Sequence, residues 1–409
     1  MASRKSARSK ASNRTPKTGA RKTRRRGASP AGAERDSWLI AARRLLEQNK
    51  VGEAFRAVQA VLKENPTDWQ ALEFAAPILF RMNHLEMGLG ALEEALDLAP
   101  DTAKIRQVLT DKLMRASLGS GLHYDRAIAA GQKTIARHGP HAALFSGLIR
   151  LLNRADRRPE AVNAADAALA HFPDVWELHF NKSVPLLHMG KHEESVTAFS
   201  GGLRPLGSTL GKSADRLLQQ YRALAGDYDD NTLHQSFGAR MAGLIAEIVG
   251  PVAGKRILDV GCGTGLLATH LKAARLVGVD LSPDMIAKAR ARKLYDELAE
   301  GDFAQVMAAR VDRFDLVVST SALYHIADLA PFFRESARLL IPGGHLFFSV
   351  DPASDSMDIG VAPTGEFAHS RRYLRRLAAE TGLVEAAIKI MPHRAMPGFW
   401  CAFQRRTGA

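Results

Sequence analysis

The sequence predicts an α/β domain built on a parallel sheet, preceded by an all-α array of helices and by a basic N-terminal tail. Three observations support this. A buried, apolar strand is followed by a glycine-rich turn near residue 260. Helical periodicity that repeats every 34 residues runs through 35–206. Residues 1–33 contain no Leu, Ile, Val or Phe. The 409 residues have room for two or three domains.

The tail, residues 1–33, carries most of the charge of the chain. It holds eleven Lys or Arg and no Asp or Glu, whereas the whole chain has a net charge of +13. The remaining residues are therefore nearly neutral. Without an apolar face the tail should be disordered. It could touch nucleic acid or an anionic surface through charge alone, without sequence specificity because it has no aromatic residue for stacking. The alternative is a solubilising extension.

The composition favours a protein without a membrane span. No run approaches eighteen apolar residues, and the N-terminal stretch lacks the apolar core of a secretory signal. The two cysteines, Cys262 and Cys401, fit a reducing compartment. We therefore expect a cytoplasmic location and no transmembrane segment.

The region 35–206 repeats a helical pattern. Pro66 and Pro100 are 34 residues apart, and a small residue, Ala54 or Gly88, lies twelve residues before each. Small residues let two antiparallel helices approach closely, and the proline ends each pair. This pattern resembles tetratricopeptide repeats, about five of them. The resemblance implies a stacked array whose groove binds a protein or peptide partner; the alternative is a structural spacer or a dimerisation module.

The junction, residues 207–250, links the array to the α/β domain. It begins with a glycine- and serine-rich linker, and a short helix is predicted at 214–225. An acidic stretch at 227–230 then leads into a helix from about Asn231 to Val249, with Asp230 or Asn231 as N-cap.

The α/β domain, residues 251–409, is organised around its first strand and turn. Residues 257–260 read as a buried strand with Asp259 as its one charge. Glycines at 261, 263 and 265 turn the chain, and a helix is predicted from Thr264 to Ala273. A strand, a glycine turn and a helix start form a nucleotide-type binding edge. The spacing is neither that of a dinucleotide site nor that of a P-loop.

A second strand, residues 275–279, ends in Asp280. An acid at this position is placed to accept hydrogen bonds from two ribose hydroxyls. Together with the glycine turn it resembles motifs I and II of the class I S-adenosylmethionine-dependent methyltransferases, over roughly residues 225–405. The resemblance implies a Rossmann-like, seven-stranded domain that binds S-adenosyl-L-methionine and transfers its methyl group.

The family pattern can be carried onto this chain residue by residue. Leu281 and Met285 match positions that touch the adenine, and Asp302 matches an acid that accepts from the adenine amino group, with Phe303 packing on the ring. An aromatic residue before the first strand folds over the cofactor in many relatives. Cys262 lies in the turn as a small residue, not as a nucleophile. The full set of expected cofactor-binding residues is Asp259, Gly261, Cys262, Gly263, Thr264, Gly265, Asp280, Leu281, Met285, Asp302, Phe303, Ser319 and Tyr228.

A fourth strand is predicted at residues 314–320. The segment that follows it, residues 321–326, matches motif IV of the family. It lacks the Asn/Asp-Pro-Pro-Tyr/Phe sequence of enzymes that methylate amino groups, and it has no cysteine. Methyl transfer needs a base only when the acceptor carries a proton that must leave. His325, with Tyr324 beside it, is the candidate base; the alternative is that His325 only lines the pocket. No metal site is expected.

The remaining elements complete the family pattern. A helix and turn at 338–345 lead to a fifth strand, 346–350, which ends at Asp351. A helix at 371–381 and two strands, 386–390 and 400–404, predict a closing antiparallel hairpin. The sequence Phe-Ala-His-Ser at 367–370 resembles a subgroup of predicted methyltransferases that also carry N-terminal tetratricopeptide repeats.

The sequence therefore predicts a methyltransferase with an unidentified acceptor, whose repeats bind a protein partner that is itself a candidate acceptor. One alternative is a small-molecule methyltransferase whose repeats only assemble it. Others are a scaffold that binds the cofactor without turnover, and an RNA methyltransferase guided by the tail.

Overall fold

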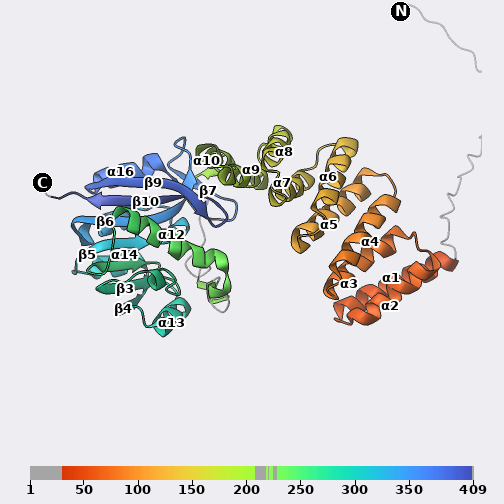
Figure 1. Cartoon of the computed structure of the whole chain (residues 1–409), viewed down its shortest axis with the longest axis horizontal. Helices are drawn as coiled ribbons and strands as arrows, with labels where there is room; N and C mark the ends of the chain where they lie inside the picture. Colours follow the sequence, from red (N-terminus) through yellow and green to blue (C-terminus); the bar gives the residue numbers. More distant parts are fainter. Residues whose placement is uncertain (1–29, 208–217, 220, 224–227, 408–409) are drawn as a thin grey trace, which may run out of the picture.

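The computed structural model of the chain describes residues 30–207, 218–219, 221–223 and 228–407. Figure 1 shows an elongated helical array that leads into a domain built around a twisted sheet. The predicted tail falls almost wholly outside the described residues, as does most of the helix predicted at 214–225. In the part of the chain that the structure describes, no helix is long and apolar enough to cross a membrane.

The array consists of helices that pack as successive pairs joined by short turns (Figure 1). Gly88 shows why small residues recur: a Cβ there would lie 2.4 Å from the Phe80 ring, so the two helices of its pair could not come as close. The predicted helical periodicity is confirmed, and the assignment to tetratricopeptide repeats stays a prediction. The helices are α1 (Pro30–Glu47), α2 (Val51–Glu64), α3 (Trp69–Arg81), α4 (Leu85–Leu98), α5 (Ala103–Ser120), α6 (Tyr124–His138), α7 (Ala142–Arg154), α8 (Arg158–His171), α9 (Trp176–His188) and α10 (His192–Gly201).

The main sheet has the strand order β4-β3-β2-β5-β6-β10-β9. All neighbours pair in parallel except β10, which is antiparallel to both β6 and β9. The predicted Rossmann-like sheet with its closing hairpin is confirmed. The strands are β2 (Arg256–Val260), β3 (Arg275–Asp280), β4 (Glu297–Glu300), β5 (Phe314–Ser319), β6 (Leu340–Ala353), β9 (Leu383–His393) and β10 (Met396–Arg405).

A small sheet extends from the end of β6. The last three residues of β6 pair with β8 (Phe367–Ser370), which pairs with β7 (Ile359–Val361). The short strand β1 (Arg204–Pro205) follows the array directly and pairs with β7. The chain therefore joins the α/β domain immediately after the last helix of the array.

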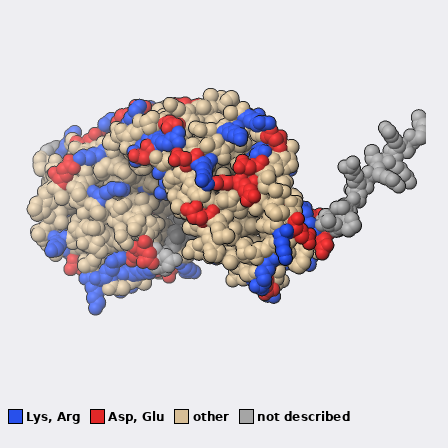
Figure 2. Space-filling model, turned by 45° about the vertical axis from the view of Figure 1, so that its right-hand side comes forward, with Lys and Arg blue, Asp and Glu red and all other residues tan. Residues whose placement is uncertain are grey.

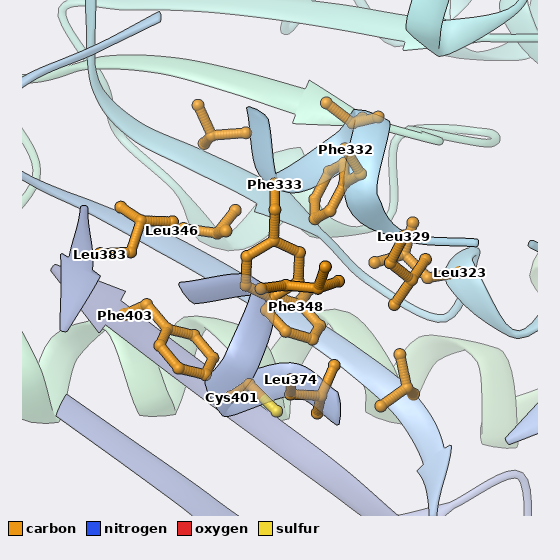
Figure 3. Close-up of a cluster of buried hydrophobic side chains, with 14 of the residues drawn as sticks. Leu323, Leu329, Phe332, Phe333, Leu346, Phe348, Leu374, Leu383, Cys401 and Phe403 are labelled. Carbon is orange, nitrogen blue, oxygen red and sulfur yellow. The ribbon is translucent and has the colours of Figure 1, made fainter. Parts of the chain in front are cut away.

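Helices cover both faces of the main sheet, as the alternation of its side chains requires. Phe347 packs with α12 and η2, whereas Phe348, the next residue, packs with α15 and α16. Figure 3 shows the second cluster, with Phe333 and Phe348 at its centre. The helices are η1 (Tyr228–Asp230), α12 (Thr232–Ile248), η2 (Leu267–His270), α13 (Pro283–Arg292), α14 (Phe303–Ala309), η3 (Leu323–His325), α15 (Ala330–Leu339) and α16 (Arg371–Glu380).

The helix predicted from Thr264 to Ala273 is wrong. Only one 3-10 turn, η2, forms there. Gly265 has φ +85°, outside the helical region, and β3 already begins at Arg275. The short connection leaves no length for an α-helix between the two strands.

The closing hairpin is longer than the sequence predicts. The strands extend to His393 and Met396, so the turn consists of Arg394 and Ala395 alone, both with positive φ (49° and 64°). Pro397, which lies between the two predicted strands, is part of β10 opposite Pro392. The extension brings His393 and Arg394 next to Asp351 of β6.

The last helix pair of the array packs directly on the α/β domain. Leu187 of α9 and Val196 of α10 belong to the same buried cluster as the strands of the main sheet. Phe199 packs with Ala353 and Met396. Glu193 forms a two-pronged ion pair with Arg371, at 2.9 Å for both contacts. These helices and the sheet share one core.

His369 on β8 predicts how stability depends on pH. Its ring is fully buried, its Nε2 lies 3.0 Å from the Ala327 carbonyl oxygen, and burial lowers its pKa to about 4. Between pH 6.5 and 4 the unfolded chain then binds a proton that the folded chain does not, so the free energy of unfolding falls as pH falls. Below pH 4 this group lowers the free energy of unfolding by its full amount, about 3 kcal/mol.

Denaturant unfolding at pH 7, 5.5 and 4.5 checks this. A His369→Asn variant should lose less stability on acidification than the wild type, whereas His84→Asn, at an exposed position, should match the wild type. Equal pH slopes for all three proteins would contradict the prediction.

Candidate functional site

The glycine turn after β2 is held against β3. The amides of Gly261 and Cys262 both donate to the Val279 carbonyl oxygen, at 2.7 and 3.0 Å. Gly261, Gly263 and Gly265 have φ values of +70°, +55° and +85°. At Gly261 there is also no room for a side chain, because a Cβ would lie 2.5 Å from the Cβ of Ala322. The turn is thus packed between β3 and the segment that follows β5.

Asp280, at the end of β3, is bonded to this turn. Its Oδ2 accepts from the Gly263 amide at 2.8 Å, and its Oδ1 accepts from the Ser282 amide at 2.9 Å. Burial raises the pKa of the carboxyl, and the backbone amides oppose that shift. Ser282 in turn caps α13, since its side chain accepts from the Met285 amide. Backbone amides therefore hold Asp280 beside the glycine turn, and the Ser282 side chain fixes the start of α13 next to it.

Asp259 is buried in β2 below the turn. Its Oδ2 accepts from the Tyr295 hydroxyl at 2.7 Å. Burial raises its pKa to about 7, against the effect of that hydrogen bond, and the nearby charge of Asp280 raises it further. Sequence reasoning missed Tyr295, because nothing local marks a tyrosine 36 residues away as the partner of Asp259.

An ion pair outside the predicted set clamps the turn from the other side. Asp229, in η1, accepts from the Thr264 hydroxyl and from Arg292 Nη2, each at 2.5 Å. Arg292 Nε donates to the Thr264 carbonyl oxygen at 2.7 Å. The sequence marked Asp229 only as part of an acidic stretch. Of the two N-cap candidates, Asn231 is the one that caps α12, accepting from the Leu233 amide.

A cavity opens at the carboxyl ends of β2, β3, β4 and β5, the edge at which such sheets bind ligands. All of the predicted cofactor-binding residues lie in its wall except Gly265, and of the two predicted catalytic residues only His325 does. Their roles in binding remain predictions. The wall also contains residues that the sequence did not single out: Leu218, Tyr221, His234, Phe237, Thr320 and Ser321.

Two hydroxyls in this wall have no hydrogen-bond partner in the part of the chain that the structure describes. Ser319 Oγ and Thr320 Oγ1, at the end of β5, are buried and make no hydrogen bond within the described residues. A buried hydroxyl without a partner is costly, by about 1–3 kcal/mol. Both are therefore available to a bound molecule.

Asp302 and Phe303 lie in the cavity wall with additional structural roles. The Asp302 side chain caps α14 by accepting from the amides of Ala304 and Gln305, at 2.9 and 3.3 Å. The Phe303 ring packs edge-on against Phe332, with centroids 6.0 Å apart. Capping leaves the second carboxylate oxygen of Asp302 without a bond to these amides.

His325 is engaged by an aromatic residue that the sequence did not predict. Its Nε2 lies 2.7 Å from the Tyr221 hydroxyl. Tyr324 is buried instead of lining the cavity, and its ring lies under the Arg394 guanidinium, 3.9 Å from the ring centroid. Tyr228 lines the cavity, stacked on His234 with centroids 4.0 Å apart.

Residues 258–348, which contain this glycine turn and the end of β5, match the family model described as "Methyltransferase domain". This segment is a methyltransferase domain. Curated relatives named "Ubiquinone biosynthesis O-methyltransferase" also match part of the chain. The protein from Ralstonia nicotianae is 39% identical over 109 residues, 24% of this chain and 44% of its own length. That from Acinetobacter baylyi is 30% identical over 144 residues, 32% of this chain and 60% of its own length. The chain thus spans about half the length of the relatives it matches.

Solved structures also resemble part of the chain. Burkholderia thailandensis 1,6-didemethyltoxoflavin-N1-methyltransferase with S-adenosylhomocysteine is 15% identical, with a TM-score of 0.41, over 50% of this chain and 95% of its own. The N-methyltransferase NodS from Bradyrhizobium japonicum is 21% identical, with a TM-score of 0.37, over 46% of this chain and 97% of its own.

A methyltransferase domain of this kind uses S-adenosylmethionine, and the residues present fit that cofactor. The glycine turn and Asp280, with its carboxylate oxygens, line the cavity, and two buried hydroxyls in its wall have no hydrogen-bond partner among the described residues. Among the described residues, no three His, Cys, Asp or Glu side chains are grouped to share a metal ion.

Proposed function

We propose that this protein transfers a methyl group from S-adenosylmethionine to an oxygen atom of its acceptor, in the crevice at the carboxyl ends of β2–β5. The observation that carries the proposal is the convergence of the glycine turn, Asp280 and the hydroxyls of Ser319 and Thr320 on one cavity. The oxygen acceptor is supported by the names of the curated relatives, which are O-methyltransferases.

The residues of the crevice would divide the work of binding. Asp280 would accept from the ribose hydroxyls, while Leu281 and Met285 would contact the adenine and Asp302 would accept from its amino group. The bound cofactor supplies a methyl group on a sulfonium, which is already a good leaving group. The chain then has to hold the acceptor in line with that methyl group and keep water out. The aromatic rings of the wall suit the second task.

Titration calorimetry with S-adenosylmethionine tests the proposal. We expect binding to the wild type, and an affinity about 30-fold weaker in Asp280→Asn, because an amide replaces two charge-assisted acceptors worth about 2 kcal/mol together. Asp284→Asn, on α13 outside the cavity wall, is the matched control and should bind as the wild type does. No binding by the wild type, or equal binding by Asp280→Asn, would refute the proposal.

The same proposal assigns partner binding to the helical array. A charged hollow lies between α4, α5 and α6, and both signs of charge line it, including Asp97, Lys133 and Arg137. In the view of Figure 2, acidic and basic side chains are interspersed over the visible face of the molecule. Such a surface suits a protein partner of mixed charge better than nucleic acid, which favours a continuous basic patch.

The acceptor class can be found by labelling. A lysate treated with the protein and S-adenosylmethionine carrying a radioactive methyl group would be separated into protein, RNA and small-molecule fractions. Label in the small-molecule fraction would support the function of the named relatives. Label in protein would make the partner of the array the acceptor, and label in RNA would bring back a role for the basic tail.

A further inference from the structure

Three residues from distant parts of the chain form a hydrogen-bonded line beside the cavity. Ser321 Oγ lies 2.9 Å from His393 Nε2, and His393 Nδ1 lies 2.9 Å from Asp351 Oδ1. Ser321 follows β5, His393 ends β9 and Asp351 lies in β6. His393 and Asp351 are buried, whereas Ser321 reaches the cavity wall. A serine, a histidine and a carboxylate in this order can pass a proton from the cavity into the domain.

The backbone of Ser321 is held in an unusual conformation. Its φ is +54°, in the left-handed region that residues other than glycine rarely adopt. The Ser321 amide donates to Ser349 Oγ at 2.9 Å, which secures this turn. Strain of this kind costs of order 1–3 kcal/mol and occurs where the surrounding structure fixes a side chain for function. Here it directs the hydroxyl toward both the cavity and His393.

The charges around His393 set the direction of proton flow. Arg394 forms an ion pair with Asp351, and Arg394 and His393 keep the pKa of that carboxyl low against the opposing effect of burial. Burial lowers the pKa of His393, with Arg394 and Arg240 acting in the same direction and Asp351 opposing them. An ionised carboxylate only accepts, so Nδ1 carries the imidazole proton and Nε2 accepts from Ser321.

We propose that Ser321, His393 and Asp351 form a proton relay that deprotonates a phenolic acceptor during methyl transfer. This rests on the proposed function. The acceptor hydroxyl gives its proton to Ser321 Oγ, while the Ser321 proton moves to His393 Nε2. The electron pair left on the acceptor oxygen forms the bond to the methyl carbon. The carbon–sulfur bond breaks, and its electrons stay on sulfur. Asp351 stabilises the resulting imidazolium.

The chemistry of the relay selects a phenol. The hydroxyl of tyrosine, a phenol, has a pKa of about 10, and burial keeps the pKa of His393 below the value of about 6.5 of a free imidazole, so this base favours an acceptor hydroxyl that is already acidic. An aliphatic alcohol is far less acidic than a phenol, so the net transfer of its proton to this base is less favourable. The rings of Tyr221, Tyr228 and Phe237 in the same wall suit a flat aromatic acceptor. His325, by contrast, has its Nε2 engaged with the Tyr221 hydroxyl.

The tautomer of His393 is the first test, and it needs neither cofactor nor acceptor. In 15N-histidine NMR of the full chain, with His393→Gln used for assignment, we expect Nδ1 to be protonated and Nε2 to be unprotonated. Ser321→Ala should shift the Nε2 resonance. A proton on Nε2, with Nδ1 bare, would overturn the relay, because Ser321 could then only accept from the imidazole.

The second test compares catechol with 4-nitrocatechol, whose hydroxyl is more acidic and is largely ionised at pH 8. Ser321→Ala should lower kcat with catechol about 100-fold, in the range of general-base catalysis, and should change kcat with 4-nitrocatechol less than about threefold. Ser356→Ala, at an exposed position, is the control and should match the wild type with both probes.

Each result of these assays decides one point. An equal loss with both probes would show that Ser321 supports the structure only, and would overturn the relay. Cofactor binding without methylation of either probe would overturn the phenolic acceptor. A wild type that fails to bind S-adenosylmethionine would instead refute the proposed function, which the tautomer of His393 does not address.

Discussion

Replacing Gly261 with alanine should weaken S-adenosylmethionine binding at least 100-fold. The new Cβ would lie 2.5 Å from the Cβ of Ala322, which is closer than two non-bonded carbon atoms can approach. Alanine at φ +70° adds about 1–2 kcal/mol of backbone strain. Relief requires the turn or the segment after β5 to move, and that segment carries Ser321 and leads into η3. Calorimetric titration with the cofactor measures the effect.

A matched substitution separates this effect from a general loss of stability. Gly243 lies inside α12, and a Cβ there would meet no atom within 4 Å. Gly243→Ala should leave binding unchanged and raise stability by up to about 1 kcal/mol, the difference in helix propensity. If Gly261→Ala bound the cofactor as tightly as Gly243→Ala, the turn would not be the binding edge.

Truncating Phe348 to alanine should lower the free energy of unfolding by about 3–5 kcal/mol. The ring is fully buried in β6 and contacts those of Phe333 and Phe403, with centroid distances of 5.5 and 5.9 Å (Figure 3). These rings join β6 and β10 to α15, and no small movement fills the space that a lost ring would leave. Chemical denaturation followed by circular dichroism gives the value.

Phe348→Leu is the control for the cavity. It keeps most of the apolar volume and should lose less than half as much stability as the alanine variant. A loss below about 1 kcal/mol in Phe348→Ala would mean that this cluster is not a close-packed core.

Local patterns sufficed to predict the elements that carry the cofactor edge. The strand at 257–260 and the acid at 280 lie where the sequence placed them, because apolar β-branched runs and terminal acids are short-range signals. The cap at Asn231 follows from its own side chain. The predicted helix after Thr264 failed because helical composition does not report the positive φ of Gly265, after which only the 3-10 turn η2 forms before β3.

Long-range pairings could not be read from the chain. Ser321 and His393 are 72 residues apart, and the hairpin that carries His393 turns at two residues with positive φ, neither of which is glycine. Arg394 and Ala395 carry no turn signal, so the strands were predicted too short and His393 stayed outside the site. Tyr221 and Asp229 were missed for the same reason, since their partners lie far along the sequence.

Because α9 and α10 share a core with the sheet, the structural boundary between the array and the α/β domain lies before α9, not after α10. By sequence these helices complete the array, but their apolar side chains are buried on β6 and β10, and Glu193 is bonded to Arg371. A chain shortened to begin at residue 207 would leave Ala353, Ala368 and Met396 without the Phe199 ring that covers them. The helices that can be replaced or removed without exposing the core of the sheet are therefore α1–α8, whereas α9 and α10 have to stay with the α/β domain.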